Sequence, residues 1–133
     1  MRLPVALALV VLAAGCGNSG PAAQAGLPQR DARMGLVEWE VTSSAGSLEG
    51  GPVTLEVTNA GTSAHDLRVT GPSTEAATAV LAPGEQATLL VDLAGESEVV
   101  LWCSLPGHRA QGMERRVPVA QGPGPRAVRS SST

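Results

Sequence analysis

Short runs in which apolar and polar residues alternate recur along the middle of this 133-residue chain, whereas apolar residues at helical spacing do not. Alternation with a period of two is typical of β-strands that bury one face. Turn-forming residues such as Asn59-Ala60-Gly61 and Pro83-Gly84 separate the runs. The pattern predicts an all-β fold, a Greek-key sandwich or barrel of about seven to eight strands. The runs are residues 37–41, 53–57, 65–69, 87–93, 97–103 and 117–119.

Length and composition indicate a single folded domain. Trp39 and Trp102 are the only large aromatic residues, so the core is expected to consist mostly of Val, Leu and Ala. Residues 34–121 contain all the alternating runs and are predicted to form the domain. Residues 16–33 and 122–133 are rich in small and polar residues, and we expect a flexible tether and a disordered tail there. A net charge of −3, evenly scattered, argues against binding to nucleic acid.

The N-terminal residues have the composition of an export signal. Arg2 is followed by an apolar run to Ala14, which is too short to span a bilayer as a mature helix, so residues 1–15 are predicted to be a signal peptide. The segment Ala13-Ala14-Gly15-Cys16 resembles the bacterial lipobox, which implies that Cys16 is lipidated and anchors an exported protein to the outer face of the membrane or in the periplasm. The alternative is an ordinary signal peptide in which Cys16 has no role.

Residue types that bind soft or borderline metals lie together near the C-terminal end. Cys103, His108 and Met113 follow one another with four residues between each pair, and Pro106-Gly107 predicts a tight bend between the first two. The only other histidine, His65, lies on the core-facing side of its run.

Singly, these residues have ordinary explanations, because a lone Cys or Met is usually a core residue. Together they supply one thiolate, two imidazoles and one thioether, the ligand set of a blue-copper electron-transfer site.

The loop Cys-Ser-Leu-Pro-Gly-His-Arg-Ala-Gln-Gly-Met resembles that of the cupredoxin family, sulfocyanin-like and plastocyanin-like bacterial members among them. The upstream segment from Asn59 to Asp66 resembles the other metal-bearing segment of the family. The resemblance covers roughly residues 36–119. It implies one copper ion with His65, Cys103 and His108 as equatorial ligands and Met113 as the axial ligand.

The same resemblance implies a function in electron transport. Cupredoxins carry single electrons between larger redox proteins, such as a cytochrome or a terminal oxidase or reductase. This chain is then expected to be an electron carrier and not an enzyme, and to be a monomer. The electron is expected to leave through His108, with Leu105, Pro106 and Ala110 as an apolar docking rim. Relatives commonly carry Asn after the first histidine, where it ties the two ligand loops together; here that residue is Asp66, whose role stays open.

Two other functions compete with the electron carrier. A copper chaperone or storage protein outside the cytoplasm is expected to have Met-rich or His-rich tracts and an open site, and the chain has no such tracts. A copper enzyme would need a second Cys near Cys103 or additional histidines, and both histidines of the chain are already used. Zinc fits two imidazoles and a thiolate, but leaves Met113 unexplained.

The lipid anchor makes a prediction that labelling can check. In cells grown with radiolabelled palmitate, the protein should incorporate the label, because Cys16 is expected to carry the acyl chains. The Cys16→Ser variant should lose both the label and retention in the membrane fraction. A Cys16→Ser protein that stays equally membrane-bound would contradict the anchor.

Overall fold

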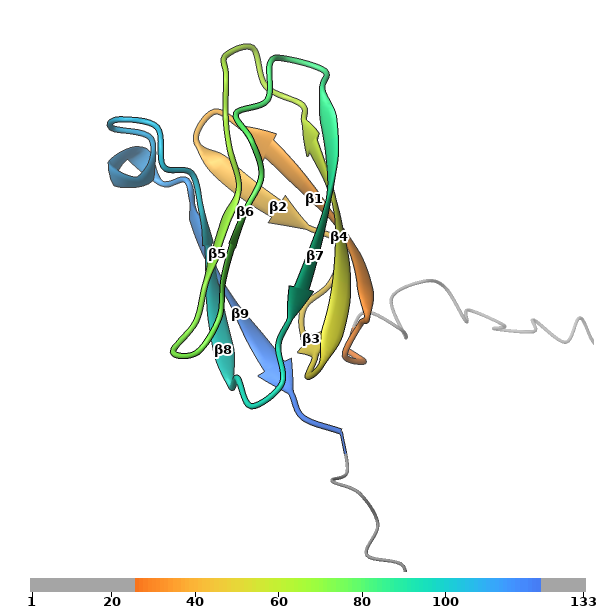
Figure 1. Cartoon of the computed structure of the whole chain (residues 1–133). Coiled ribbons are helices and arrows are strands. Elements are labelled where there is room, and N and C mark those ends of the chain that lie inside the picture. The colour runs from red at the N-terminus through yellow and green to blue at the C-terminus, as the bar shows by residue number, and fades with distance from the viewer. Residues whose placement is uncertain (1–25, 123–133) are drawn as a thin grey trace, which may run out of the picture.

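The structure, a computed structural model, describes residues 26–122 and confirms the all-β prediction (Figure 1). The described residues form nine strands in two packed sheets and one 3-10 helix, η2 (Arg109–Gln111). Two of the strands that lie outside the predicted runs have only two and three residues. The strands are β1 (Asp31–Val37), β2 (Glu40–Ser43), β3 (Leu48–Glu49), β4 (Pro52–Asn59), β5 (Arg68–Thr70), β6 (Glu75–Ala77), β7 (Gln86–Asp92), β8 (Glu98–Trp102) and β9 (Glu114–Ala120).

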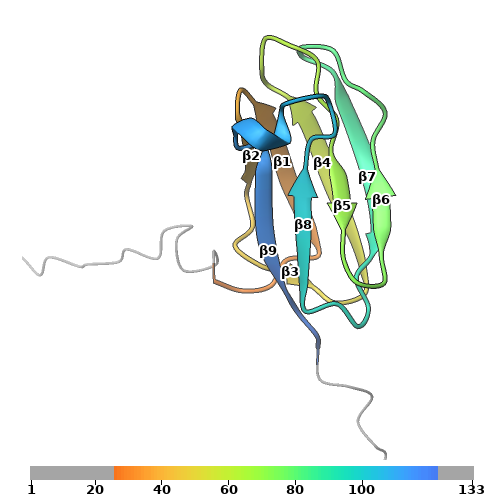
Figure 2. The same ribbon diagram turned by 90° about the vertical axis from the view of Figure 1, so that its left-hand side faces the viewer.

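The two sheets differ in their strand order. One sheet has the order β2-β1-β4-β7 and the other the order β3-β9-β8-β5-β6, and Figure 2 shows the second sheet in front of the first. Most neighbours are antiparallel, but β1 pairs with β4 and β3 pairs with β9 in parallel. Parallel neighbours require a long crossover connection, and the one from β1 to β4 runs through β3 of the other sheet.

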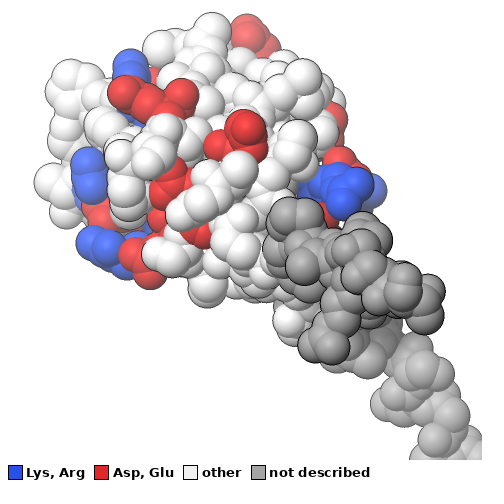
Figure 3. Space-filling model, turned by 60° about the horizontal axis from the view of Figure 1, so that its bottom comes forward, with Lys and Arg blue, Asp and Glu red and all other residues white. Residues whose placement is uncertain are grey.

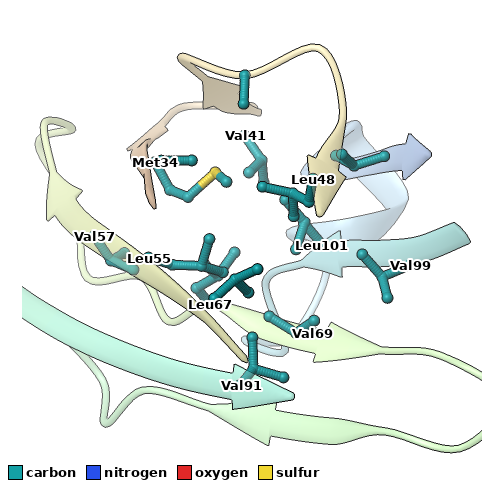
Figure 4. Packing of buried hydrophobic residues seen from close by; sticks show 14 of the residues in the cluster. Met34, Val41, Leu48, Leu55, Val57, Leu67, Val69, Val91, Val99 and Leu101 are labelled. Atoms are coloured by element: carbon teal, nitrogen blue, oxygen red, sulfur yellow. The ribbon is translucent and has the colours of Figure 1, made fainter. Parts of the chain in front are cut away.

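The core lies between the sheets and follows the alternation of the sequence. The inward-facing apolar residues of the runs at 53–57 and 97–103 are buried, whereas Val100 and Trp102 on the other face of β8 are half-buried and Leu90 of β7 is 73% exposed. Figure 4 shows Leu55 and Leu101 from opposite sheets pointing into the same apolar interior. With no Phe or Tyr in the chain, close packing there depends on Val, Leu and Met side chains.

The predicted start of the domain at residue 34 is wrong, because ordered pairing begins earlier. Strand β1 starts at Asp31 and pairs with β4 in the register Asp31↔Thr54. Before it, the Gln29 backbone N–H donates to the carbonyl of Ser47 at 3.0 Å. The small and polar composition of this segment favours a tether. Of residues 31–33, however, only Ala32 is buried, so this part of the strand can form beside β4 with few apolar residues. Residues 1–25, with the predicted signal peptide, Cys16 and most of the predicted tether, lie outside the described residues. Residues 123–133 of the predicted tail also lie outside them.

Residues 37–41 were predicted to form one strand, and this prediction is also wrong. The chain turns at Glu38 and Trp39, so that β1 and β2 form a hairpin with Val37 opposite Glu40. Tight hairpin turns usually contain Gly, Asn or Asp, and neither turn residue is one of these. The apparent alternation therefore continued through a reversal of the chain, and it hid two residues that reach the site described below.

The loops at one end of the sandwich carry the candidate ligands, while the opposite end comes forward in Figure 3. On the face shown there, acidic and basic side chains lie interspersed among uncharged ones. Within residues 26–122, the structure contains no helix of the length and hydropathy needed to cross a membrane.

Candidate metal centre

Strand pairing brings the two metal-bearing segments to the same end of the second sheet. His65 lies just before β5 and Cys103 just after β8, and these neighbouring strands are antiparallel in the register Arg68↔Trp102. The residues before one strand therefore lie beside those after the other. The loop after β8 continues through η2 into β9, which pairs with β8 on its other side. All four predicted ligands thus fall on connections at one end of three adjacent strands.

Three of the predicted ligands converge. The Nδ1 atoms of His65 and His108 lie 3.1 Å apart, and the Sγ of Cys103 lies 4.0 Å from the first and 3.6 Å from the second. Within the described residues, these three side chains form the one group of His, Cys, Asp or Glu whose ligand atoms lie close enough together to hold a metal ion. A point equidistant from the corners of this triangle lies about 2.1 Å from each, and bonds from a metal to imidazole nitrogen or thiolate sulfur are about 2.0–2.3 Å long. The triangle therefore has the size that one ion requires.

Met113, the fourth predicted ligand, is completely buried, and its backbone is hydrogen-bonded to two residues of this triangle. The Cys103 N–H donates to the carbonyl of Met113 at 3.1 Å, and the Met113 N–H donates to the carbonyl of His108 at 3.2 Å. These two bonds close residues 103–113 into a compact loop. The loop holds the thioether-bearing residue next to the thiol and the second imidazole.

The bend predicted at Pro106-Gly107 is present. The His108 N–H donates to the carbonyl of Leu105 at 3.1 Å, and Gly107 has φ +80. Pro before a residue with positive φ is typical of a type II turn, and Gly adopts that conformation without the steric cost of a side chain. The bend returns His108 toward Cys103.

The candidate ligand His65 is held by its own backbone hydrogen bonds and by the buried side-chain amide of Asn59. Its N–H and carbonyl both bond to Leu81, at 3.1 and 2.7 Å. The Asn59 side chain donates to the carbonyls of Ser63 and Leu81, each at 2.8 Å, and accepts from the N–H of Gly61. Since a buried amide with these partners has little freedom to move, His65 is positioned before any ion binds.

Asp66 joins the two metal-bearing segments. Its carboxylate accepts a hydrogen bond from the N–H of Ser104 at 2.6 Å and a second, short one from the Ser104 hydroxyl. Asp66 is 3% exposed, and the Nε of Arg68 lies 3.6 Å from its Oδ2. A buried carboxylate that accepts a charge-assisted bond across two segments fixes their separation. The role that the sequence left open is therefore to tie residue 66 to residue 104, next to one ligand from each segment.

Burial raises the pKa of the Cys103 thiol above its ordinary value, because an apolar environment disfavours the thiolate. The thiol therefore keeps its proton at neutral pH until a cation binds. Metal binding then requires that proton to leave, so uptake of an ion by this site is coupled to release of a proton.

The turn between β1 and β2 contacts both histidines from outside. Glu38 Oε1 lies 3.0 Å from the Nε2 of His65, and hydrogen bonds from Ser63 hold the pKa of the Glu38 carboxyl well below its usual range. The ring of Trp39 meets the ring of His108 edge to face, with 4.9 Å between their centroids. Sequence reasoning missed both contacts because nothing in the sequence signals a turn at this point.

The predicted exit and docking residues lie at the surface end of the loop. His108 and Leu105 are half-buried, while Pro106 and Ala110 are exposed. Trp39 is 39% exposed beside His108. It extends the apolar surface at this end beyond the residues that the sequence indicated.

Comparisons with known proteins bear on the fold. No family model matches the sequence, and no curated protein matches it either. Among solved structures, the chain is similar to a dithionite-reduced auracyanin from the photosynthetic bacterium Roseiflexus castenholzii, with a TM-score of 0.58 and 19% identity over 71% of this chain and 99% of that one. It is also similar to auracyanin B, with a TM-score of 0.57 and 16% identity over 71% and 91% of the two chains. The fold is that of a cupredoxin.

A multicopper oxidase matches less completely. Its TM-score is 0.50 at 17% identity, and the match covers 68% of this chain but only 41% of the oxidase.

A cupredoxin fold with two imidazoles and a thiolate within bonding distance of one point, beside a buried Met, fits one type 1 copper ion.

The link through Asp66 predicts a measurable effect on stability. Asp66→Ala leaves the Ser104 N–H and hydroxyl without their acceptor, and loss of such buried bonds costs about 1–3 kcal/mol. Urea denaturation of the copper-free protein should show this loss, and copper should also dissociate faster to a chelator. Ser104→Ala removes only the hydroxyl bond and should cost less. A variant Asp66→Ala as stable as the unchanged protein would contradict the link.

Proposed function

We propose that this protein is a mononuclear type 1 copper protein that carries single electrons between larger redox proteins outside the cytoplasmic membrane. The observation that supports this most is the triangle of His65, Cys103 and His108, whose dimensions suit one ion. A bound copper ion supplies the one-electron Cu(II)/Cu(I) couple. The likeness of residues 103–113 to the sulfocyanin-like and plastocyanin-like loop supports placing it among such bacterial carriers.

The surroundings of the ligands favour rapid electron exchange. His65 is held by Asn59 and Leu81, and the Cys103 segment by Asp66. Ligands fixed by packing and hydrogen bonds move little when the charge at their centre changes, so little reorganisation accompanies the transfer. Whether this geometry is imposed by the protein or intrinsic to copper–thiolate bonding does not alter that consequence.

His108 is the ligand placed to pass the electron to a partner. It is half-buried, whereas Cys103, His65 and Met113 are fully buried. We propose that Leu105, Pro106 and Ala110, which lie within three residues of His108 in the same loop, form a small apolar docking surface with the ring of Trp39. A surface of this size suits a transient partner such as a cytochrome or a terminal oxidase or reductase, since electron-transfer complexes have small interfaces.

The burial of the ligands also distinguishes this proposal from the alternative, a copper chaperone or store. A chaperone must pass its ion to another protein, so its ligands need to be accessible. Here three of the four are buried, and the chain has no histidine beyond the two in the site for a second copper or for catalysis. We also propose that the chain is not an enzyme by itself and acts as a monomer. We further propose that residues 1–15 are a signal peptide for export and that lipidated Cys16 anchors the protein to the membrane.

Copper binding makes an optical prediction. The purified protein should bind one equivalent of Cu(II), turn intensely blue, and bleach on reduction, because the colour arises from the copper–thiolate bond. Cys103→Ser should lose the blue absorption entirely, while Ser104→Ala, its neighbour outside the ligand set, should keep it. Blue colour retained in Cys103→Ser would contradict the assignment.

Electron transfer and copper transfer can be compared directly. The reduced protein should reduce a soluble cytochrome much faster than it loses copper to a chelator, because the ion is buried while the edge of His108 is accessible. Ala110→Asp should slow electron transfer about tenfold or more by placing a charge at an exposed position of the docking rim, without changing copper loss.

The matched control for Ala110→Asp is Leu90→Asp, which places the same charge at another exposed position, on the outer face of β7. It should leave both rates unchanged. If copper loss to the chelator outpaces electron transfer, the chaperone or storage function is favoured instead.

A further inference from the structure

Glu38 lies outside the ligand set, yet its carboxylate contacts a ligand directly. We infer that Glu38 is a positioning residue that fixes the tautomer of His65 and, through its negative charge, stabilises the oxidised ion relative to the reduced one. This inference rests on the proposed function, since it concerns the copper bound at that site. It adds a residue that neither the ligand motif nor strand periodicity identifies.

The first step is the direction of the hydrogen bond. Glu38 Oε1 accepts bonds from the N–H of Thr62 at 2.9 Å and from the N–H and hydroxyl of Ser63 at 2.8 and 2.7 Å. An oxygen surrounded by three donors is an acceptor and not a protonated hydroxyl. At 3.0 Å from the same oxygen, the Nε2 of His65 must therefore carry the proton.

The second step concerns the other ring nitrogen. When the Nε2 of a neutral imidazole carries the proton, Nδ1 has a free lone pair. In His65 that Nδ1 points to the ligand triangle, 3.1 Å from the Nδ1 of His108 and 4.0 Å from the Sγ of Cys103. Glu38 therefore selects the tautomer that the site needs and fixes the plane of the ring. A carboxylate on the outer nitrogen also makes an imidazole a more basic ligand.

The third step is that the surroundings accommodate this carboxylate closely. A Cβ at Gly61 would lie 2.6 Å from Glu38 Oε1 and 2.8 Å from Oε2, so the absence of a side chain there lets the carboxylate approach the loop. On the other side of the turn, a Cβ at Gly112 would lie 2.9 Å from the carbonyl of Trp39. Two glycines thus leave space for the hairpin turn against both ligand-bearing loops.

The charge of Glu38 has a consequence for the couple. Glu38 is partly open to solvent, but its Oε1 lies 3.0 Å from the Nε2 of the fully buried His65, so no water lies between the two groups and their interaction is screened incompletely. A negative charge one imidazole ring away from the ion attracts Cu(II) more strongly than Cu(I). Removing that charge should therefore lower the affinity for Cu(II) more than that for Cu(I), and raise the reduction potential.

The test is a redox titration of the full chain loaded with copper. Glu38→Gln keeps an oxygen acceptor but removes the charge, and should lower the ratio of Cu(II) to Cu(I) affinity about tenfold, which corresponds to about 59 mV for one electron. Glu38→Ala removes the acceptor as well, and should in addition weaken copper binding by about 10–100-fold. An unchanged potential in a blue, folded Glu38→Gln protein overturns the inference while leaving the proposed function intact.

Glu40→Gln is the matched control. Glu40 is exposed, lies two residues along the same hairpin, and carries the same charge. Its removal should shift the potential much less, because water screens an exposed charge. Equal shifts in the two variants would attribute the effect to net charge and overturn a specific role for Glu38.

A second measurement requires neither copper nor a folded variant. Nitrogen-15 NMR of the unchanged copper-free protein, about two pH units above the ordinary imidazole pKa, reports which ring nitrogen of His65 carries the proton. Protonation at Nε2 with slow solvent exchange supports the inference, and protonation at Nδ1 alone overturns it. If the protein takes up no copper and shows no blue colour, the proposed function fails, and this measurement still decides the placement of the Glu38 hydrogen bond.

Discussion

The carboxylate of Asp66, bonded to the N–H and hydroxyl of Ser104, joins two segments that are separated by 38 positions in the sequence. One segment carries His65 and the other carries Cys103. The antiparallel pairing of β5 with β8 brings them to the same end of the sheet, but pairing alone sets only the backbone spacing. The buried hydrogen bonds of Asp66 then fix the loops to each other, and the convergence of the ligands depends on that connection.

Both sheets contribute to the centre, although all four predicted ligands lie at one end of the second sheet. The hairpin of β1 and β2 belongs to the first sheet, and its turn places Glu38 on His65 and Trp39 on His108. Folding of that hairpin therefore helps to hold the two imidazole rings in one orientation. In the proposed electron carrier, these outer contacts would restrict both rings while His108 remains half-buried.

The ligand residues could be predicted because few residues of the right chemistry exist in the chain. It has two histidines, and the Cys and Met of one loop are separated from His108 by four residues each. Buried strands could be predicted because alternation survives in β4, β8 and the segment leading into β5. Alternation failed at residues 37–41, since a two-residue turn without Gly, Asn or Asp leaves the pattern of apolar residues unbroken across a reversal of the chain.

The sequence by itself determined the class of fold, the bend at Pro106-Gly107 and the chemical identity of the candidate ligands, because these follow from local periodicity, backbone preference and side-chain chemistry. Only the tertiary structure decided which groups surround the ligands. The contacts of Asp66 with Ser104 and of Glu38 with His65 join residues far apart in the chain. A hydrogen bond of this kind depends on strand register and turn geometry, and these are set by the packing of the two sheets rather than by neighbouring residues.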